Sequence, residues 1–319
     1  MTLHLPGIGH VHGNFHNYYK FHPVAARCDL FPPGFWLDLW KAQGKPKHFQ
    51  LLDVGCNEGD LTVALVAVAT DQLKSEDVEV KGTGIDIDAE LIDRATSKWS
   101  GASGETRGVT FHALDFMEID KVLEKFKGSM NFISLFSITM WIHLNHGDEG
   151  LEAFLSLSAQ LLVESCDYAA LLVEPQPWKA YRNASHRTRK LGLPEPKYWS
   201  KIKLRNLDVD INRIVAGLGG FHSALFLGRE MWGRQLAVYF ANKHEEGGSG
   251  GAASLQPLGL RVLWEVVREA GEERDTTAGG AGLSKRKKKQ EKRAAEKKQK
   301  IAARRAERER GHDEASGST

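Results

Sequence analysis

Apolar and polar residues follow two different periods along the middle of the chain. Short apolar runs that end in a glycine or an acidic residue are separated by segments of about ten residues with helical spacing. The apolar runs predict strands at Phe49–Val54, Val78–Ile85, Val109–Leu114, Phe132–Phe136, Tyr168–Val173 and Gln235–Ala241. The segments between them predict helices at Asp60–Thr70, Ala89–Trp99 and Leu151–Leu162. This alternation is typical of βαβ units around a parallel sheet, in which ligands bind beyond the carboxyl ends of the strands.

The pattern changes after residue 241. Gly247–Ala253 has the composition of a flexible linker, Leu258–Val267 is a short amphipathic piece, and Lys285–Arg310 has no apolar stripe. Residues 285–319 contain 14 Lys and Arg and 6 Asp and Glu, a balance of +8, so the net charge of +2 leaves −6 for the other residues. The sequence therefore predicts a mildly acidic globule with a basic tail. We expect an N-terminal extension, one domain, and a flexible linker followed by a basic, largely disordered tail, at residues 1–12, 13–241 and 242–319.

The composition excludes several classes of protein. With 41% hydrophobic residues, the 319-residue chain can bury a sizeable core, which excludes wholesale disorder. No apolar run approaches the ~20 residues that span a bilayer, and the N-terminus lacks the basic-then-apolar pattern of a secretion signal. The cysteines Cys28, Cys56 and Cys166 lie far apart, which is typical of a reduced, intracellular protein. We therefore expect no disulfide framework, no metal site and no membrane partner.

The end of the first predicted strand has the composition of a ligand-binding turn. Gly55 allows close approach of a ligand to the backbone, and Gly59 stands where the next helix starts. Asn57 takes the place of the middle glycine of a dinucleotide motif, and asparagine tolerates left-handed backbone angles. Glu58 and Asp60 argue against a pyrophosphate and favour a ligand with a positive centre. The alternative is an ordinary tight turn between a strand and a helix.

The ends of the second and third strands carry further polar groups. Asp86 stands at the carboxyl end of its strand, where a carboxylate accepts hydrogen bonds from both ribose hydroxyls. Asp88 is better explained as the N-cap of the next helix. Asp115 offers an acceptor for an exocyclic amine and Phe116 a ring for a base, although a turn residue and a core residue are equally good explanations. Taken in order, the three strand ends predict a site for S-adenosylmethionine.

Longer motifs elsewhere in the chain resemble one family. They are Gly13-Asn14-Phe15 with Tyr18–Pro23, Ser137–Asp148, and Val173–Trp178 with Tyr181-Arg182. With the first turn, they resemble the class I S-adenosylmethionine-dependent methyltransferases and, among these, the bicoid-interacting-type RNA 5′-end methyltransferases. Trp141–Asp148 and Arg189–Leu193 look closest to the branch that acts on 5′-monophosphate ends. The resemblance covers about residues 13–241 and leaves the tail uncovered.

This resemblance implies a fold, an activity and a cofactor. The fold is α/β and Rossmann-like, with a mostly parallel, seven-stranded sheet. The activity is transfer of a methyl group from S-adenosylmethionine to the 5′-terminal monophosphate of small RNAs such as tRNA and precursor microRNA. The alternatives are methylphosphate capping of a 5′-triphosphate small nuclear RNA or, less favoured, methylation of a small molecule or a protein. A non-catalytic RNA-binding protein is the alternative from another class, and the intact cofactor residues argue against it.

The resemblance also assigns roles at the cofactor site. It implies that Arg27 reaches the methionine carboxylate, although a single Arg beside a Cys and an Asp is usually part of a surface ion pair. The complete implied cofactor set is Arg27, Gly55, Asn57, Asp86, Asp115, Phe116, Phe136 and Ser137.

The substrate side of the site needs residues that position a phosphate. A phosphate oxygen is already anionic, so no general base is required. We expect His143 and Asn145, on the loop after the fourth strand, and Tyr181, after the fifth, to position the substrate. The alternative for His143 is a hydrogen-bonded structural histidine, and Trp178 is more typical of packing than of base stacking.

Basic residues near these motifs predict contacts with RNA. The predicted RNA-binding set is Tyr19, Lys20, Lys179, Arg182, Arg189 and Lys190. A patch with helical spacing is either a solvated helix face or a strip that follows RNA phosphates, and the otherwise acidic globule favours the strip. The patch consists of Arg182, His186, Arg187, Arg189 and Lys190. We expect a monomer whose partner is RNA with a 5′ phosphate. We expect it in the cytoplasm, with a second, nuclear location because Lys285–Lys289 is typical of an import signal.

Overall fold

The computed structural model describes residues 12–13, 18–99, 108–162, 168–229, 233–241, 260–263 and 265–269, without the side chains of residues 20 and 21. The chain divides into two units after Val267, and the elements below belong to the first unit. The predictions for residues 1–11, for the Gly247–Ala253 linker and for the Lys285–Arg310 tail lie outside the described residues.

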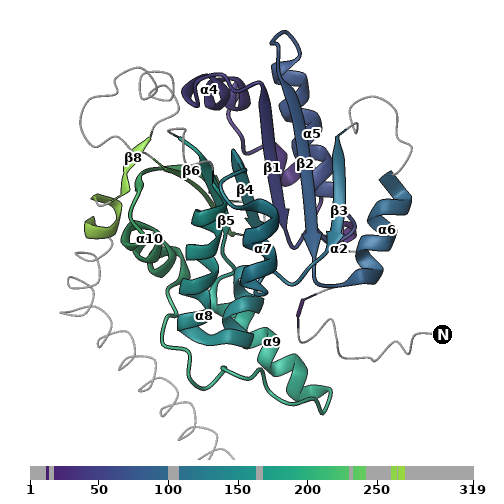
Figure 1. Cartoon of the computed structure of the whole chain (residues 1–319). Coiled ribbons are helices and arrows are strands. Elements are labelled where there is room, and N and C mark those ends of the chain that lie inside the picture. The colour runs from purple at the N-terminus through teal and green to yellow at the C-terminus, as the bar shows by residue number, and fades with distance from the viewer. Residues whose placement is uncertain are drawn as a thin grey trace, which may run out of the picture. The chain divides into compact units, whose positions relative to one another are not determined.

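An eight-stranded sheet forms the centre of the first unit (Figure 1). Its strands are β1 (His48–Val54), β2 (Glu79–Asp86), β3 (Val109–Ala113), β4 (Phe132–Phe136), β5 (Ala170–Glu174), β6 (Phe221–Arg229), β7 (Gln235–Ala241) and β8 (Arg261–Val262). They are ordered β3-β2-β1-β4-β5-β7-β6-β8. Strands β1 to β5 are parallel, whereas β7, β6 and β8 pair in antiparallel fashion. The predicted α/β architecture with a mostly parallel sheet is confirmed, and the expected seven strands become eight.

The helices connect the strands and cover the sheet. They are α2 (Tyr18–Phe21), α3 (Ala25–Cys28), α4 (Phe35–Ala42), α5 (Asp60–Leu73), α6 (Ala89–Trp99), α7 (Ile119–Phe126), α8 (Thr139–Leu161), α9 (Trp178–Lys190) and α10 (Leu207–Gly217). Helices α5 and α6 begin at the predicted residues. Helix α8 corrects the prediction, because it begins at Thr139 rather than Leu151 and continues across a kink at Gly147, whose φ is 77°. None of the described helices is both long and apolar enough to cross a membrane.

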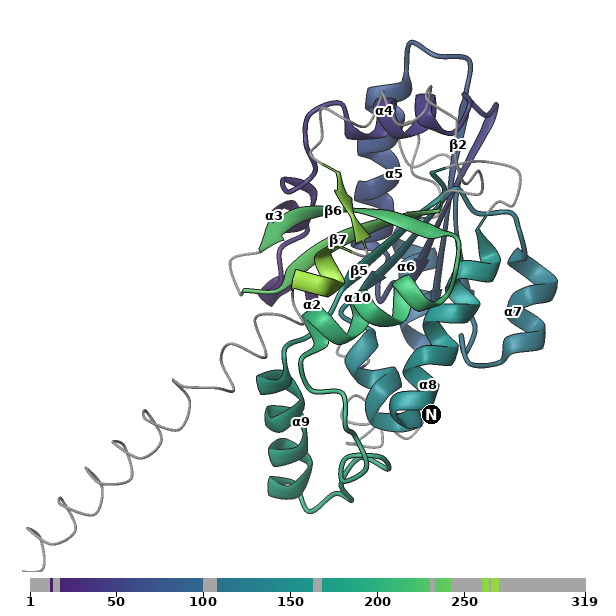
Figure 2. The ribbon, with the colours of Figure 1, turned by 90° about the vertical axis from the view of Figure 1, so that its left-hand side faces the viewer.

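The two faces of the sheet are packed by different helices. Successive residues of a strand point to opposite faces, so odd and even positions of β1 enter different hydrophobic clusters. Phe49 and Leu51 pack with α4 and α5, whereas Leu52 and Val54 pack with the cluster that contains α7, α8 and α10. Figure 2 shows α4 and α5 apart from α7, α8 and α10, with the strands between them. This layering leaves the carboxyl ends of the parallel strands open for a ligand.

A segment beyond the predicted domain boundary belongs to the folded unit. Strand β8 pairs with Ser223 and Ala224 of the edge strand β6. Leu263 is fully buried and Val266 is nearly so. The amphipathic piece seen in the sequence therefore docks its apolar side on the core, because burial of two aliphatic side chains contributes about 3–6 kcal/mol. The boundary predicted at residue 241 is too early, since the first unit extends to Val267.

Candidate active site

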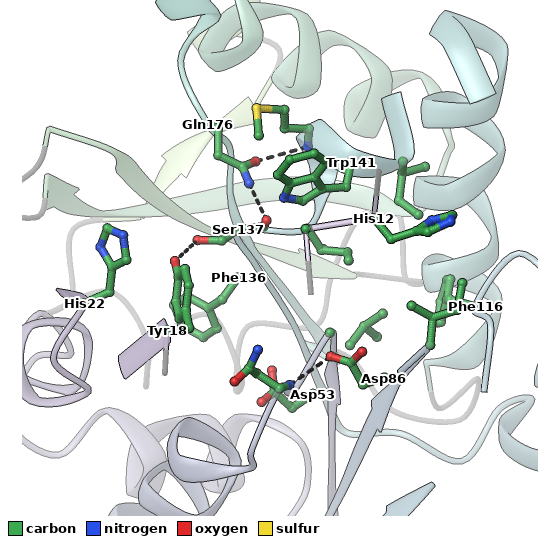
Figure 3. Close-up of a pocket in the computed structure, with 18 of the residues that line it drawn as sticks. His12, Tyr18, His22, Asp53, Asp86, Phe116, Phe136, Ser137, Trp141 and Gln176 are labelled. Atoms are coloured by element: carbon green, nitrogen blue, oxygen red, sulfur yellow. Dashed lines mark hydrogen bonds between the residues drawn. The ribbon is translucent and has the colours of Figure 1, made fainter. Parts of the chain in front are cut away.

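A cavity of about 560 Å³ lies at the carboxyl ends of the parallel strands. Figure 3 shows Asp53 and Asp86 on one side of it and Gln176 and Trp141 on the other. The residues predicted to hold the cofactor all line it: Arg27, Gly55, Asn57, Asp86, Asp115, Phe116, Phe136 and Ser137. Tyr19 and Asn145 also line it, whereas the following predicted residues do not: His143, Lys179, Tyr181, Arg182, Arg189 and Lys190. A cavity of this size holds a ligand as large as a nucleoside derivative.

The first turn is held by backbone geometry. Gly55 and Asn57 both have left-handed φ values, 77° and 55°. The turn favours glycine at position 55 for its left-handed angle, and a Cβ there would also crowd the Ile138 side chain at 3.0 Å. The backbone N–H of Asn57 donates to the Asp86 carboxylate at 2.9 Å, which ties the first strand end to the second. The predicted ligand turn is thus formed by residues that share one local backbone network.

Asp86 is a buried acceptor at the cavity wall. Its side chain is 7% exposed, and its two oxygens accept the backbone N–H groups of Asn57 and Asp88 at 2.9 and 3.0 Å. Burial raises the pKa of Asp86 to about 6. A carboxylate accepts about four hydrogen bonds, so capacity remains for two hydroxyl groups from the cavity. A ribose, which has two neighbouring hydroxyl donors, fits this acceptor.

The third strand end supplies a polar group and an apolar surface. Asp115 accepts the Met117 amide N–H at 2.9 Å, which also makes it a turn residue. Phe116 lines the cavity but is mostly buried against Phe154, with ring centroids 5.0 Å apart. Ile87, which we did not predict, is 43% exposed and lines the cavity directly after Asp86. The signal in the sequence is an aliphatic residue directly after the acidic strand end, where it can pack against a base.

A charged cluster closes the opposite side of the cavity. Arg27 is 1% exposed, and its Nε and Nη2 lie 2.7 and 3.2 Å from the two carboxylate oxygens of Glu174. Arg234 donates to the same carboxylate at 2.6 Å. The Ser137 hydroxyl donates to Glu174 at 2.6 Å and lies 2.8 Å from the Tyr18 hydroxyl. We call these five residues the arginine cluster.

The arginine cluster carries an excess of positive charge. Burial alone would lower the pKa of Arg27, but the Glu174 charge and its hydrogen bonds outweigh burial and raise it. Two guanidinium groups therefore share one carboxylate that is 0% exposed. This corrects the surface-ion-pair alternative for Arg27. It also adds Arg234, which lines the cavity and whose only sequence signal is a cation at the start of an apolar strand. A cavity wall of this charge fits a carboxylate or a phosphate.

His143 and Tyr181 lie in the core behind the cavity. The His143 ring is fully buried, with Nδ1 3.0 Å from the Tyr181 hydroxyl and Nε2 2.7 Å from the Asp148 carboxylate. Burial lowers the pKa of His143, against the opposing effect of Asp148. The prediction that these two side chains position the substrate is corrected to a structural role. The physical reason is the early start of α8, which turns position 143 toward the core.

The same helix turns other residues toward the cavity. Trp141, Asn145 and His146 of α8 line it, and the Asn145 amide donates to the Trp141 carbonyl at 2.9 Å. Gln176 fixes the start of the helix, because its oxygen accepts the Met140 N–H at 3.1 Å and its amide group donates to the Ser137 carbonyl. Of the predicted substrate-positioning residues, Asn145 alone lies at the cavity.

The predicted RNA strip is divided between two faces of α9. Arg187 lines the cavity together with Ala180, Asn183 and Ala184. The exposed side chains of Lys179, Arg182, Arg189 and Lys190 lie outside the cavity lining. Arg189 pairs with Glu195 at 2.7 Å. Tyr19 of α2 donates its hydroxyl to the Cys56 carbonyl at 3.3 Å, and the side chain of Lys20 lies outside the described residues.

A parallel sheet with a glycine turn, a buried ribose-type acceptor and a cationic wall at its carboxyl edge defines an α/β protein that binds a nucleoside-containing ligand. Residues 130–240 match the family model described as Bicoid-interacting protein 3 (Bin3). The chain is 35% identical over 247 residues to a pre-miRNA 5′-monophosphate methyltransferase of Xenopus laevis, covering 73% of this chain and 93% of that protein. The chain belongs to the Bin3 family, as its sequence motifs predicted.

Other relatives span both branches of this family. An RNA 5′-monophosphate methyltransferase of Homo sapiens is 36% identical, covering 72% of this chain and 80% of that protein. The U6 snRNA methylphosphate capping enzyme Amus of Drosophila melanogaster is 30% identical, covering 61% of each chain. Among solved structures, the magnesium protoporphyrin IX methyltransferase of Synechocystis with bound SAM shares 16% identity and a TM-score of 0.43, over 72% of this chain and 86% of that chain.

Proposed function

We propose that this protein is an S-adenosylmethionine-dependent RNA methyltransferase that methylates the 5′-terminal monophosphate of small RNAs. The observation that carries the proposal is the pairing, in one cavity, of a ribose acceptor at Asp86 with an excess of positive charge at the arginine cluster. The activity for which the relatives are named supports it, and these relatives are 35–36% identical to this chain over 247 and 245 aligned residues.

Different residues at the cavity bind different parts of the cofactor. Asp86 accepts the ribose hydroxyls, Asp115 accepts the exocyclic amine, and Ile87 packs against the base. Arg27, held by Glu174, faces the methionine carboxylate. When bound, S-adenosylmethionine supplies an electrophilic methyl group on a sulfonium centre.

The role of the chain is to position the phosphate and the cofactor and to exclude water. It does not have to supply a proton acceptor. A phosphate oxygen is an anionic nucleophile, so no side chain has to remove a proton. Asn145, Trp141 and Arg187 line the substrate side of the cavity, where an amide, an indole and a guanidinium donate to oxygens that do not react. His22 also lines the cavity, but burial, followed by Arg234 and Arg27, lowers its pKa to about 4, so it is a poor base at neutral pH.

Which RNA is the substrate is a separate proposal from the type of reaction. The names of the relatives favour precursor microRNA and other 5′-monophosphate RNAs, and tRNA stays a prediction of the motifs. Methylphosphate capping of a 5′-triphosphate RNA is the second candidate, supported by the likeness to Amus. The monomeric state and the cytoplasmic and nuclear locations stay predictions.

The test compares one RNA with three 5′ ends. The 5′-monophosphate, 5′-triphosphate and 5′-hydroxyl forms are incubated with enzyme and S-adenosylmethionine, and mass spectrometry locates any added methyl group. We expect methylation of the monophosphate and none of the hydroxyl form. Equal methylation of 5′-hydroxyl RNA would contradict the proposal, and a strong preference for the triphosphate would favour the capping activity.

A further inference from the structure

The connection between α9 and α10 concentrates positive charge in an otherwise acidic domain. From residue 196 to residue 206 the sequence contains Lys197, Lys201, Lys203 and Arg205 and no acidic residue. Residues 1–284 as a whole carry a net charge of −6. We call these four cations the connection surface. Figure 2 shows the connection leaving the free end of α9 and returning to α10.

Aromatic rings fix the connection although it has no regular secondary structure. Trp199 stacks on Trp178 of α9, with ring centroids 5.2 Å apart and an angle of 7° between the planes. The Arg205 guanidinium lies 5.0 Å from the centre of the Trp178 ring. Tyr181 also stacks on Trp178, at 5.1 Å. Trp178 is therefore engaged in packing, as the sequence favoured, and its ring supports Trp199 and Arg205.

A second set of contacts anchors the connection to α8. Tyr198 donates its backbone N–H to the Leu144 carbonyl at 3.1 Å. Its ring packs so closely on Gly147 that a Cβ there would lie 2.7 Å from it. The Asp148 carboxylate accepts the backbone N–H of Lys203 at 3.0 Å. The cations thus stand on a preorganised support, which lowers the entropic cost of binding.

The charges of the connection surface are directed outward. The ammonium groups of Lys197 and Lys201 lie 5.3 and 5.5 Å from the centre of the Tyr198 ring, and all four cationic residues are exposed. Within the described ranges, no ion pair joins any of the four to an acidic side chain. Their charge is available to an external anion.

The connection surface lies beside the cavity. Tyr198, whose ring lies below the ammonium groups of Lys197 and Lys201, packs on Gly147, and the preceding residue, His146, lines the cavity. On the other side, Trp178 begins the helix whose Ala180 lines the cavity. A polyanion whose end enters the cavity therefore meets these cations next.

We propose that Lys197, Lys201, Lys203 and Arg205 bind the phosphate backbone of the RNA beyond its 5′ end. The inference rests on the proposed function and extends it from the terminal phosphate to the body of the substrate. Cations that are held on a rigid support of packed aromatic rings bind phosphates irrespective of the RNA sequence. Counterions are released from the RNA when these cations bind it. The surface would make the enzyme prefer an RNA of several nucleotides over a phosphorylated mono- or dinucleotide.

The test neutralises two cations at the connection and two elsewhere. The variant K197Q/K201Q is compared with K41Q/K47Q, which removes the same charge from exposed lysines that lie outside the cavity lining. Binding of a fluorescent hairpin RNA with a 5′ monophosphate is followed by anisotropy over a range of salt. Methylation is measured on the hairpin and on a 5′-phosphorylated dinucleotide.

We expect K197Q/K201Q to weaken hairpin binding roughly tenfold and to reduce the salt slope by about two, and K41Q/K47Q to resemble the wild type. For K197Q/K201Q, kcat/KM should fall on the hairpin far more than on the dinucleotide. Unchanged hairpin binding, or equal losses in both variants, overturns the proposal. Loss of poly-glutamate binding with RNA binding intact would assign the surface to an acidic protein and also overturn it.

The two proposals fail in different ways. If the wild type methylates neither phosphorylated substrate, the proposed function fails, while the anisotropy difference between the variants still decides whether the connection binds RNA. If the wild type methylates both substrates and the variants do not differ, only the connection surface is wrong. Circular dichroism of both variants confirms that the comparison is made between folded proteins.

Discussion

The two sides of the cavity are built in different ways. At the ends of β1 and β2, short turns place Gly55, Asn57 and Asp86, and backbone N–H groups hold the Asp86 carboxylate. At the ends of β4 and β5, the arginine cluster is assembled from α2, α3, the ends of two parallel strands and the residue before β7. The first side depends on local sequence, whereas the second depends on the whole fold. Changes on the first side should therefore affect binding, and changes on the second should affect stability as well.

The largest effect is expected from Glu174→Gln. The change leaves the guanidinium groups of Arg27 and Arg234 without their carboxylate in a buried position, which should reduce the free energy of unfolding by about 3–5 kcal/mol. Urea denaturation measures this loss. Arg234→Gln is the matched variant, and it should cost less because Arg27 keeps both contacts with Glu174. Equal stability of E174Q and the wild type would show that the arginine cluster is not a structural unit.

On the opposite side, Asp86→Ala should weaken cofactor binding. It also removes the acceptor of the Asn57 and Asp88 backbone N–H groups, so affinity is measured on protein shown to be folded by circular dichroism. Removing the acceptor of two ribose hydroxyls should cost about 2–3 kcal/mol, which is roughly 30- to 150-fold in the Kd for S-adenosylmethionine. Isothermal calorimetry measures the change. The pKa of Asp86 is about 6, so the wild-type affinity should fall as the pH drops below that value and the carboxylate becomes protonated. The D86A variant should lack this pH dependence, and an unchanged Kd would refute the assignment.

A smaller effect should distinguish the core behind the cavity from the cavity itself. Tyr181→Phe removes the hydroxyl that lies 3.0 Å from His143 Nδ1 and leaves a buried ring nitrogen unsatisfied, at a cost of about 1–3 kcal/mol. Methyl-transfer kinetics should change little, because neither side chain lines the cavity. Asn145→Ala is the converse variant, with reduced kcat/KM and nearly unchanged stability. A Y181F enzyme that is stable but inactive would restore the catalytic prediction.

The smallest effect is expected at the outer face of α9. Arg189 makes an exposed ion pair with Glu195, so Arg189→Gln should change stability by less than about 1 kcal/mol. Arg187→Gln, on the cavity face of the same helix, should lower kcat/KM for RNA more than R189Q does. Equal kinetic losses would show that the RNA follows the whole basic strip rather than the cavity face alone.

The sequence predicted what depends on local chemistry. Strands β1 to β5, the turn at Gly55 and the acid at Asp86 follow from runs and residues that lie close together in the chain. It failed where side-chain direction depends on a helix boundary. The sequence pattern placed His143 and Asn145 on a loop after the fourth strand. In the structure α8 starts at Thr139, and its phase turns His143 to the core and Asn145 to the cavity.

Other parts were missed because their signals are weak or distant. Strand β6 carries two register shifts and alternates poorly, so its pattern is not that of a strand. Arg234 meets Arg27 only because β7 is inserted between β5 and β6, and no spacing in the sequence indicates this meeting. The buried docking of Leu263 is a tertiary contact of the short amphipathic piece at Leu258–Val267, which was predicted to lie in the tail.

The short strand β8 has a consequence for the solubility of the protein. Exposed edge strands offer unpaired N–H and C=O groups to other chains and so promote aggregation. At the β6 edge, β8 pairs with the backbone at Ser223 and Ala224. Residues from beyond the predicted domain therefore cover part of this exposed edge. A chain ending at residue 241 should therefore self-associate as its concentration rises, and light scattering should show this, whereas a chain ending at residue 269 should stay dispersed.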